Sequence, residues 1–438
     1  MTDATRDLAA PIAAPVRTQP AVVSGDAVMV GAGAVGLALG IALARAGLKV
    51  VLVGRIDTRP AGRTVALLAG SVRFLARLGV WPQLQALAEP LRVMRLVDDT
   101  GSLFRGPPVA FEATEIGRDC FGHNIENHLL VEGLAEAARQ VRGLTLLPGR
   151  AESFAFGTDA VSAHGPEGLS VEGSVLVATD GRRSSARTAA GLAARETHYP
   201  QEALTTTLSH DRPHRGVSTE FHTREGPFTL VPLPGMPGAP HRSSLVWVMG
   251  PKEAERRAAF TPQRLAREIE RQSRMLLGRI AVAGVVGRFP VGRLKADRIT
   301  GRRIALAGEA AHAMAPIGAQ GLNLSLRDAA ALADILSDAK RAGQDLGSAS
   351  VLDRYAAVRQ NDIAARSFGV DRLNRALMDD SLPTDLVRGI GLLALGSIGP
   401  LRRFAMRQGL MPAADQDRGA RSGGGVNPGR RDANRGRP

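Results

Sequence analysis

The chain has 438 residues, more than a single small core needs, and this length favours two or more lobes. Its formal charge is +14, yet only four of its 56 basic residues are lysine, and the arginines are scattered rather than gathered in a stripe. Aromatic residues make up only 4% of the chain, so the composition argues against nucleic-acid binding and leaves an anionic membrane surface or an acidic partner as better fits.

The N-terminal residues 1–24 have no periodicity and no charged-then-apolar signal layout, which predicts a disordered leader. The single cysteine, Cys120, excludes an internal disulfide and suits a reducing compartment. The apolar run GIGLLALGSIGPL near the C-terminus is shorter than the ~20 residues of a spanning helix. We therefore predict a cytoplasmic protein, with a peripheral contact at the inner face of the membrane as an open alternative.

Between its two ends the chain alternates between helical and β-rich patterns. A strand, a glycine turn, a helix and a second strand follow one another over 27–53. Apolar periodicity predicts helices over 65–78, 128–140 and 261–277. Residues 93–121 resemble antiparallel sheet, and 199–250 alternate like a sheet with hairpins. Further strand-like stretches are LTLLPGRAESFAF, GSVLVATDGRRS and RRIALAG. The layout predicts a two-lobed protein in which β-rich material interrupts a nucleotide-binding lobe.

Three glycines, Gly31, Gly33 and Gly36, stand where the first strand passes into the first helix. In a dinucleotide-binding turn the first glycine permits the tight bend, the second lets the backbone approach a pyrophosphate, and the third lets helix pack on strand. The amide groups and dipole at the helix start favour the negative phosphates. Because a strand precedes the turn and another follows the helix, the sequence predicts a dinucleotide site.

The acid that usually binds the ribose is missing from this pattern. It should end the second strand, about 20 residues after the turn. That place reads VVLVGRID, with Gly54 where the acid belongs and Arg55 after it, while Asp57 is expected to lie too far past the strand end. Either another group, such as backbone, binds the ribose, or affinity for the adenosine half is reduced.

Three separated motifs together identify a family. They are GAGAVG, VLVATDGRRSSAR and LAGEAAHAMAPIGAQGLNLSLRDAAAL. In this order they resemble the single-component FAD-dependent aromatic hydroxylases, which are built like para-hydroxybenzoate hydroxylase. Over most of 25–412 the chain is most similar to the ubiquinone-biosynthesis hydroxylases, which add oxygen to polyprenylated phenols.

The resemblance implies an α/β fold, in which a discontinuous Rossmann-like FAD-binding lobe carries an inserted antiparallel β-sheet substrate lobe and C-terminal helices. Parts of the FAD-binding lobe are predicted at 25–92, 122–197 and 298–345. Parts of the substrate lobe are predicted at 93–121 and 198–297. Helices are predicted to fill 346–412, and a flexible basic tail is predicted over 413–438.

The resemblance also implies which residues contact FAD. Asp180 and Gly181 correspond to a pair beside the pyrophosphate, and Gly308 and Glu309 to a Gly-Asp pair whose acid contacts the ribityl chain or the ribose. The loop from Pro316 to Asn323 corresponds to the segment against the isoalloxazine ring. The residues expected at the cofactor are Gly31, Gly33, Gly36, Arg55, Arg63, His128, Asp180, Gly181, Gly308, Glu309, Pro316, Gly318, Gly321, Leu322 and Asn323.

The chemistry that the resemblance implies belongs mainly to the cofactor. NAD(P)H, bound transiently, or another reductant reduces FAD, a C4a-hydroperoxide forms, and its distal oxygen attacks the phenol ring. We assign no catalytic residue, and we expect Pro316 and Gly318 to position the flavin. His312 is expected to have a packing role rather than to act as a base, and the histidines at 198, 210, 214, 222 and 241 lack metal-ligand spacing.

Two aspects of the function stay open at this point. The enzyme could hydroxylate a soluble aromatic acid, or the chain could be a flavin-free scaffold in a ubiquinone-synthesis complex, a reading that Gly54, His128 and Glu309 keep open. The apolar segment with Arg388, Arg402, Arg403 and Arg407 could rest on a membrane, cap the fold or form a subunit contact. Apolar residues of the β-rich lobe could form a substrate wall or plain core: Phe221, Phe228, Leu230, Leu245 and Trp247.

Overall fold

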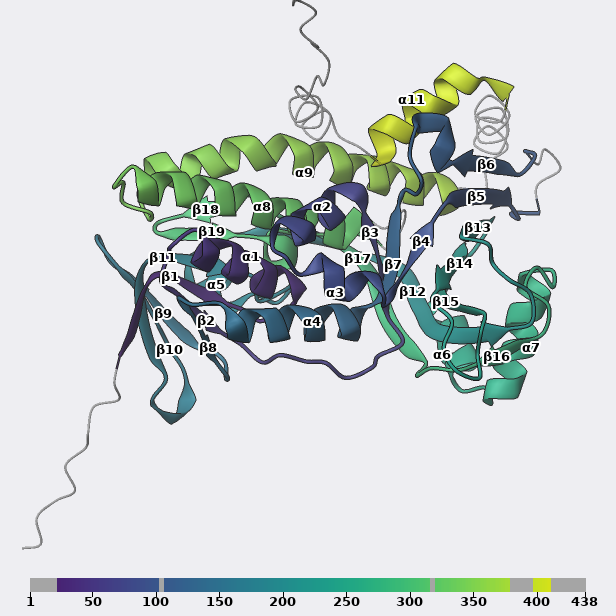
Figure 1. Cartoon of the computed structure of the whole chain (residues 1–438), viewed down its shortest axis with the longest axis horizontal. Coiled ribbons are helices and arrows are strands. Elements are labelled where there is room, and N and C mark those ends of the chain that lie inside the picture. The colour runs from purple at the N-terminus through teal and green to yellow at the C-terminus, as the bar shows by residue number, and fades with distance from the viewer. Residues whose placement is uncertain (1–21, 102–105, 316–319, 379–396, 411–438) are drawn as a thin grey trace, which may run out of the picture.

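The computed structural model describes residues 22–101, 106–315, 320–378 and 397–410 (Figure 1). The first of its three sheets is built from segments far apart in the sequence. Its main path runs β18 (Thr300–Gly301), β19 (Ile304–Leu306), β11 (Ser170–Ala178), β1 (Val23–Val30), β2 (Val50–Val53) and β8 (Leu144–Leu147). The hairpin of β9 (Ser153–Phe156) and β10 (Val161–His164) joins it through β11. Since β19, β11, β1, β2 and β8 pair in parallel, their carboxyl ends meet at one edge.

Buried apolar runs explain this sheet. All four residues of β2 are buried, as are the last four of β1 and of β11, which is the pattern of parallel strands covered on both faces. Helix α1 (Ala34–Arg45) packs against α4 (Asn127–Gln140) and α8 (Gln320–Arg341). Helix α9 (Ala349–Met378) lies along α8 (Figure 1). The hydroxyl of Tyr355 on α9 donates to the carbonyl of Leu306, 2.9 Å away, and so ties α9 to the sheet.

The second sheet belongs to the β-rich lobe at the other end of the molecule (Figure 1). Its path is β20 (His312–Ala313), β17 (Gly287–Ala296), β12 (Ala194–His210), β15 (Arg242–Met249), β14 (Gly226–Leu233), β13 (Val217–Thr223), β5 (Val93–Asp98) and β6 (Val109–Glu112). Strand β16 (Ile280–Val282) pairs with β12. All pairs are antiparallel except β13 with β5. This combination of lobes confirms the predicted fold class.

Helices α6 (Pro251–Ala258) and α7 (Pro262–Gln272) cover one face of the second sheet. Against them lie all five apolar residues that were candidates for the substrate wall, Phe221, Phe228, Leu230, Leu245 and Trp247. Each is at most 4% exposed. Of the two alternatives for these residues, core packing is therefore the one that the structure supports.

A small third sheet corrects one predicted helix. Residues expected to begin a helix at Val65 instead form β3 (Thr64–Leu68), which pairs with β7 (Gly122–Glu126) beside β4 (Ala88–Leu91). Helix α2 (Ala69–Arg77) starts only afterwards, and α3 (Trp81–Gln85) follows. The apolar spacing of 65–68 fits strand and helix equally, and the pairing with β7, some 60 residues away in the chain, decides between them.

The remaining short elements are α5 (Ser185–Ala189), α11 (Gly399–Leu410), and the 3₁₀ turns η1 (Ala113–Ile116), η2 (Pro166–Gly168) and η3 (Gly308–Ala310). Strand β1 begins at Val23, so the last two residues of the predicted leader belong to it. Residues 1–21 of the leader, the predicted tail 413–438 and the segment 379–396 lie outside the described residues. Within the described part of the chain, no helix combines the length and the apolar character needed to cross a bilayer.

Candidate active site

One cavity of about 1060 Å³ lies where the carboxyl ends of the parallel strands face the second sheet. The residues that end or follow β1, β2, β11 and β19 form one side of it: Val30, Gly31, Val53, Gly54, Thr179, Asp180, Ala307 and Gly308. Residues of β5, β13, β14 and β15 form the opposite side: Met94, Ser218, Glu220, Thr229, Val231 and Val246. The start of α8 contributes Gln320, Gly321 and Leu322. Such a crevice at the strand ends is where open α/β sheets bind ligands.

Steric crowding explains two of the three glycines at the start of α1. Gly31 has φ +101°, and a Cβ there would lie 2.4 Å from the carbonyl oxygen of Thr179. The Thr179 hydroxyl in turn donates to the carbonyl of Gly31, 2.8 Å away. A Cβ on Gly36 would lie 1.9 Å from the Gly31 carbonyl oxygen. Gly31 and Gly36 thus let the turn, the helix and the loop after β11 come together.

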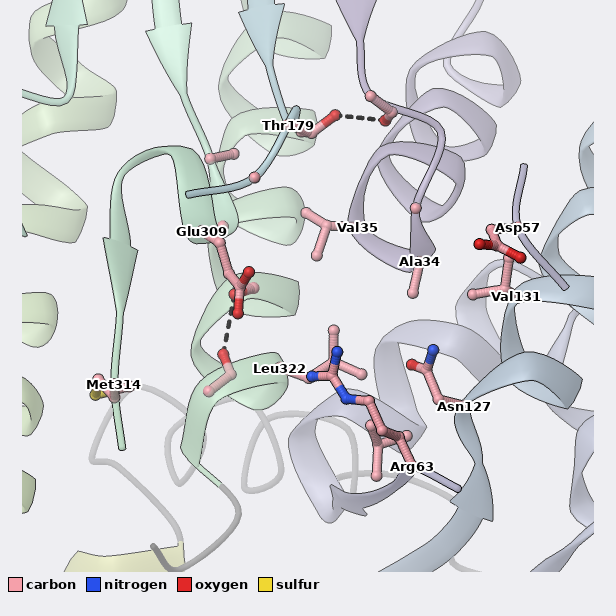
Figure 2. Close-up of a pocket in the computed structure, with 18 of the residues that line it drawn as sticks. Ala34, Val35, Asp57, Arg63, Asn127, Val131, Thr179, Glu309, Met314 and Leu322 are labelled. Carbon is pink, nitrogen blue, oxygen red and sulfur yellow. Dashed lines mark hydrogen bonds between the residues drawn. The ribbon is translucent and has the colours of Figure 1, made fainter. Parts of the chain in front are cut away.

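The missing ribose acid has a similar explanation. A Cβ on Gly54 would lie 2.4 Å from the amide nitrogen of Ala32, so the glycine turn leaves no room for a side chain at the end of β2. Asp57, which was expected to lie too far along the chain, lines the cavity instead, and Figure 2 shows its carboxylate on the wall. Hydrogen bonds from the side chain and backbone of Arg59 lower the pKa of Asp57. A carboxylate is therefore present on this side of the cavity, three residues later than the usual pattern.

Other features of the wall fit FAD. Among the described residues, a Cβ on Gly33, Gly181 or Gly321 would meet no atom within 4 Å, although all three residues line the cavity. These glycines leave room for a ligand to approach the backbone. The Oδ1 atom of Asp180 is buried with no hydrogen-bond partner among the described residues, and a ligand hydroxyl would satisfy it. The shape and the unpaired acceptor match a dinucleotide with hydroxyl groups.

Charged and polar side chains surround this space. The guanidinium of Arg63 lies over the ring of Phe289, with 4.7 Å between its Cζ atom and the ring centroid. In Figure 2 Arg63, Asn127 and Leu322 reach toward the same space from the loop before β3, from α4 and from α8. His128 does not line the cavity; its Nδ1 atom lies 3.9 Å from the Glu126 carboxylate. The residue that faces the cavity at the start of α4 is Asn127, which the sequence pattern did not single out.

Asn323 also stands outside the cavity wall, and it fixes the start of α8. Its side-chain Oδ1 accepts hydrogen bonds from the amide of Leu68, 2.8 Å away, and from the hydroxyl of Ser71, 2.6 Å away. Its Nδ2 donates to the carbonyl of Ala66 at 2.7 Å. These bonds join α8 to β3 and α2, so Asn323 positions the segment that presents Gly321 to the cavity.

His312 belongs to a buried network behind the cavity. Its Nε2 donates to Oδ2 of Asp328 at 2.6 Å, and the same oxygen accepts from the amide of Gly308 at 2.9 Å. The Nε of Arg359 donates to the other carboxylate oxygen at 2.8 Å. His312 is 1% exposed and does not line the cavity, in keeping with the expected packing role.

The structure thus brings together ten of the residues expected at the cofactor: Gly31, Gly33, Arg55, Arg63, Asp180, Gly181, Gly308, Glu309, Gly321 and Leu322. Gly36, His128 and Asn323 lie outside the lining, and Pro316 and Gly318 lie outside the described residues. Asp57, Asn127 and Thr179 line the cavity without having been predicted. Across the described ranges, no group of three or more His, Cys, Asp or Glu residues could hold a metal ion.

Comparisons with known proteins agree with this geometry. The profile of the family described as FAD binding domain matches residues 25–366. Ubiquinone hydroxylase UbiL of Rhodospirillum rubrum is 33% identical over 392 residues, which are 88% of this chain and 89% of the relative. The 3-demethoxyubiquinol 3-hydroxylase of Escherichia coli is 28% identical and covers 87% of this chain and 97% of its own.

Solved structures match the fold. The p-nitrophenol 4-monooxygenase PnpA of Pseudomonas putida superposes with a TM-score of 0.72 at 21% identity, over 90% of this chain and 99% of its own. PqsL of P. aeruginosa in complex with 2-aminobenzoylacetate gives 0.69 at 24% identity, over 84% and 99%. Because the family profile spans most of the chain and a curated relative exceeds 30% identity over nearly its whole length, the chain belongs to the FAD binding domain family and, within it, to the ubiquinone-biosynthesis FAD-dependent hydroxylases.

Proposed function

We propose that this protein hydroxylates the aromatic ring of a polyprenylated phenol in ubiquinone biosynthesis. The observation that carries the proposal is one continuous cavity that joins the glycine turn at Gly31 to the second sheet at Val246. A cofactor held at the first end and a ring held at the second would share one cavity. The names of the relatives, which are ubiquinone hydroxylases, support the choice of substrate over a soluble aromatic acid.

The residues at the two ends suit these roles. Gly31, Gly33 and Asp180 would hold the dinucleotide part of FAD, while Gly321 and Leu322 would lie at its ring end. When bound, FAD supplies the redox chemistry and the activation of oxygen that the protein's side chains lack. The sequence contains one glycine fingerprint, which FAD would occupy. We therefore propose that NAD(P)H, if it is the reductant, binds transiently without a Rossmann lobe of its own.

Deletion of the gene tests the proposal directly. Cells without it should accumulate a polyprenylated quinone precursor that lacks one ring oxygen, and mass spectrometry of extracted lipids should identify it. The purified protein should also be yellow and should turn over the accumulated precursor in detergent. Normal ubiquinone in the deletion strain, together with brisk turnover of salicylate-like acids, would favour the soluble aromatic substrate instead.

A lipophilic substrate requires access from a membrane, and a second cavity of about 1090 Å³ supports a membrane contact. Five arginines from α2, α8, α11 and the segment after η1 line it: Arg73, Arg77, Arg118, Arg327 and Arg407. Asp119 is the one acidic residue among the described residues of its wall. Apolar side chains, among them Phe74 and Leu326, lie between the arginines. Arginines and apolar side chains in one cavity wall match the head groups and chains of anionic phospholipids.

Helix α11 extends this surface. The Nε of Arg402 donates to the Glu115 carboxylate at 2.8 Å, and Met406 is buried beside Phe121, so the helix is fixed to the β-rich lobe. Ile398, just before the helix, and Phe404, within it, are 49% and 61% exposed, and Arg407 of the same helix lines the second cavity. Exposed apolar side chains beside arginines are the features of a helix that rests in a membrane interface. We propose that this corner faces the membrane.

Charge reversal at Arg77 should weaken binding to anionic vesicles. Each arginine near an anionic surface contributes about 1 kcal/mol, so Arg77→Glu should reduce binding to phosphatidylglycerol-containing vesicles by about 2 kcal/mol in a flotation assay. Arg139→Glu on α4 makes the same charge change away from the arginine-lined cavity and should have a much smaller effect. Equal losses in the two variants would mean that net charge, not this corner, determines the binding.

A further inference from the structure

The cavity-facing side of the second sheet carries an acid that no step above uses. Along β13, Phe221 packs in the core under α6 and α7, while Ser218 and Glu220, on the other face of the strand, line the cavity. On β14, Thr229 and Val231 line the cavity beside them. Glu220 therefore stands on the wall where the ring of a substrate would lie, opposite the residues that suit FAD.

Two side chains hold the Glu220 carboxylate in place. The Nε2 of His222, two residues along the same strand face, lies 2.8 Å from Oε1 of Glu220 and donates to it. The Thr229 hydroxyl donates to Oε2 from 3.4 Å. The side chains of His222 and Glu220 are 7% and 16% exposed, so the pair is shielded without being closed off from the cavity. These two bonds use only part of the acceptor capacity of a carboxylate, which has about four lone-pair sites.

The chemistry of phenol hydroxylation gives such a carboxylate a task. When a ring carbon bonds to one oxygen atom of dioxygen, the O–O bond breaks and the other atom leaves as water, with the two electrons that bound, reduced FAD would supply. The ring loses electron density in this step, and the phenolic O–H becomes strongly acidic. The O–H bond then breaks, its electron pair forms the carbon–oxygen double bond of a neutral ring ketone, and the proton needs an acceptor. Loss of the proton from the hydroxylated carbon to water later restores the aromatic ring. A carboxylate can accept this first proton because the phenolic O–H of the oxygenated ring is a much stronger acid than that of the phenol before oxygen transfer.

We propose that Glu220 is a catalytic residue that accepts the hydrogen bond of the substrate's phenolic O–H and takes its proton during oxygen transfer, while His222 positions the carboxylate. The inference rests on the proposed function, since it requires a phenol as substrate. It assigns a substrate-binding and proton-accepting role to the second sheet. It also accounts for a carboxylate–histidine pair on a wall that otherwise presents hydroxyls and aliphatic groups.

Glu220→Gln tests the proposal, because glutamine keeps the size of the side chain but loses the charge and the basicity. General-base catalysis contributes typically 10²–10⁴-fold, so kcat should fall at least about 100-fold, while KM should rise by no more than the roughly 10-fold that the hydrogen bond to the phenol is worth. Glu220→Asp should recover part of the loss. A matched control is Glu196→Gln on β12, which removes a carboxylate that also neighbours a histidine, His198, but is exposed and away from the cavity. The control should behave like the natural protein.

A binding measurement on the oxidised, FAD-loaded protein gives a readout that needs no turnover. The natural protein should bind a short-chain phenol about 10-fold more tightly than the methyl ether of the same phenol, because only the phenol donates to Glu220. Glu220→Gln should reduce this preference, and Glu196→Gln should not. If the natural protein hydroxylates the phenol but Glu220→Gln keeps both the preference and kcat, the inference is wrong and the proposed function stands. If the natural protein neither binds nor hydroxylates phenols, the proposed function itself is wrong.

Discussion

An aspartate introduced at Gly54 should weaken FAD binding, even though proteins with this turn commonly carry an acid there. Its Cβ would lie 2.4 Å from the amide nitrogen and 2.8 Å from the Cβ of Ala32, inside the glycine turn itself. Both contacts are too short for real atoms, so β2 and the turn would have to separate. Overpacking of this kind costs about 1–3 kcal/mol. We expect Gly54→Asp to lower the thermal stability and to reduce FAD affinity at least ~10-fold in a fluorescence titration.

Gly33→Ala is the matched comparison, because it adds a methyl group two residues into the same turn. Gly33 has φ −80°, which any residue adopts, and its Cβ would meet no protein atom within 4 Å. The variant should therefore unfold at the same temperature as the natural protein in the absence of FAD. The methyl group would extend into the cavity and should still reduce FAD affinity. An increase in affinity on Gly54→Asp would show that the turn can move aside and that the missing acid does limit binding.

These two glycines show how far the sequence could predict the site. Spacing along a βαβ unit predicted the turn, because the tight bend, the backbone approach and the helix packing are all local requirements. The reason for Gly54 was not local: it depends on the distance between β2 and the turn, which only the paired sheet sets. Asp57, Asn127 and Thr179 were missed for the same reason, since each reaches the cavity through the packing of elements distant in sequence. A polar residue directly after an apolar strand, as Thr179 is after β11, was the one available signal.

The second sheet shows a different limit. Alternation along β13, β14 and β15 predicted strands, and the structure confirms them. A period of two divides residues into two faces but does not say which face meets helices and which meets a ligand. Phe228 and Trp247 lie on the helix side, while their neighbours Thr229 and Val246 line the cavity. The face with the larger apolar side chains packs in the core, and the face that carries both polar and apolar side chains lines the cavity.

Asp328→Asn should be strongly destabilising, because it breaks a fully buried group of charges behind the cavity. The Asp328 carboxylate is 0% exposed and accepts hydrogen bonds from His312, from Arg359 and from the amide of Gly308. Removing its charge takes away one of the two carboxylates that contact the Arg359 guanidinium, itself 5% exposed, and leaves Asp362, 2.7 Å away. Breaking a buried pair costs about 3–5 kcal/mol, and we expect the lower end of that range because Asp362 remains. Chemical denaturation should show a loss of that size, and FAD should be released at lower denaturant, because Gly308 and Glu309 line the cavity.

The pH dependence of the stability difference distinguishes the contribution of the Asp328 charge from the contribution of its packing. Burial raises the pKa of Asp328, but the charges of His312 and Arg359 and the hydrogen bonds outweigh it and hold the pKa below its ordinary value. A carboxyl group with a lowered pKa in the folded state stabilises the protein above its unfolded pKa of about 4, and that contribution is lost as the pH falls through the folded value. The difference in stability between the natural protein and Asp328→Asn should therefore be largest at neutral pH and should shrink on acidification below about pH 4.

Asp338→Asn, on the same helix but 59% exposed and paired with Arg341, should cost no more than about 1 kcal/mol. If the two variants were equally stable, the buried charges could not be what holds Gly308 at the cavity.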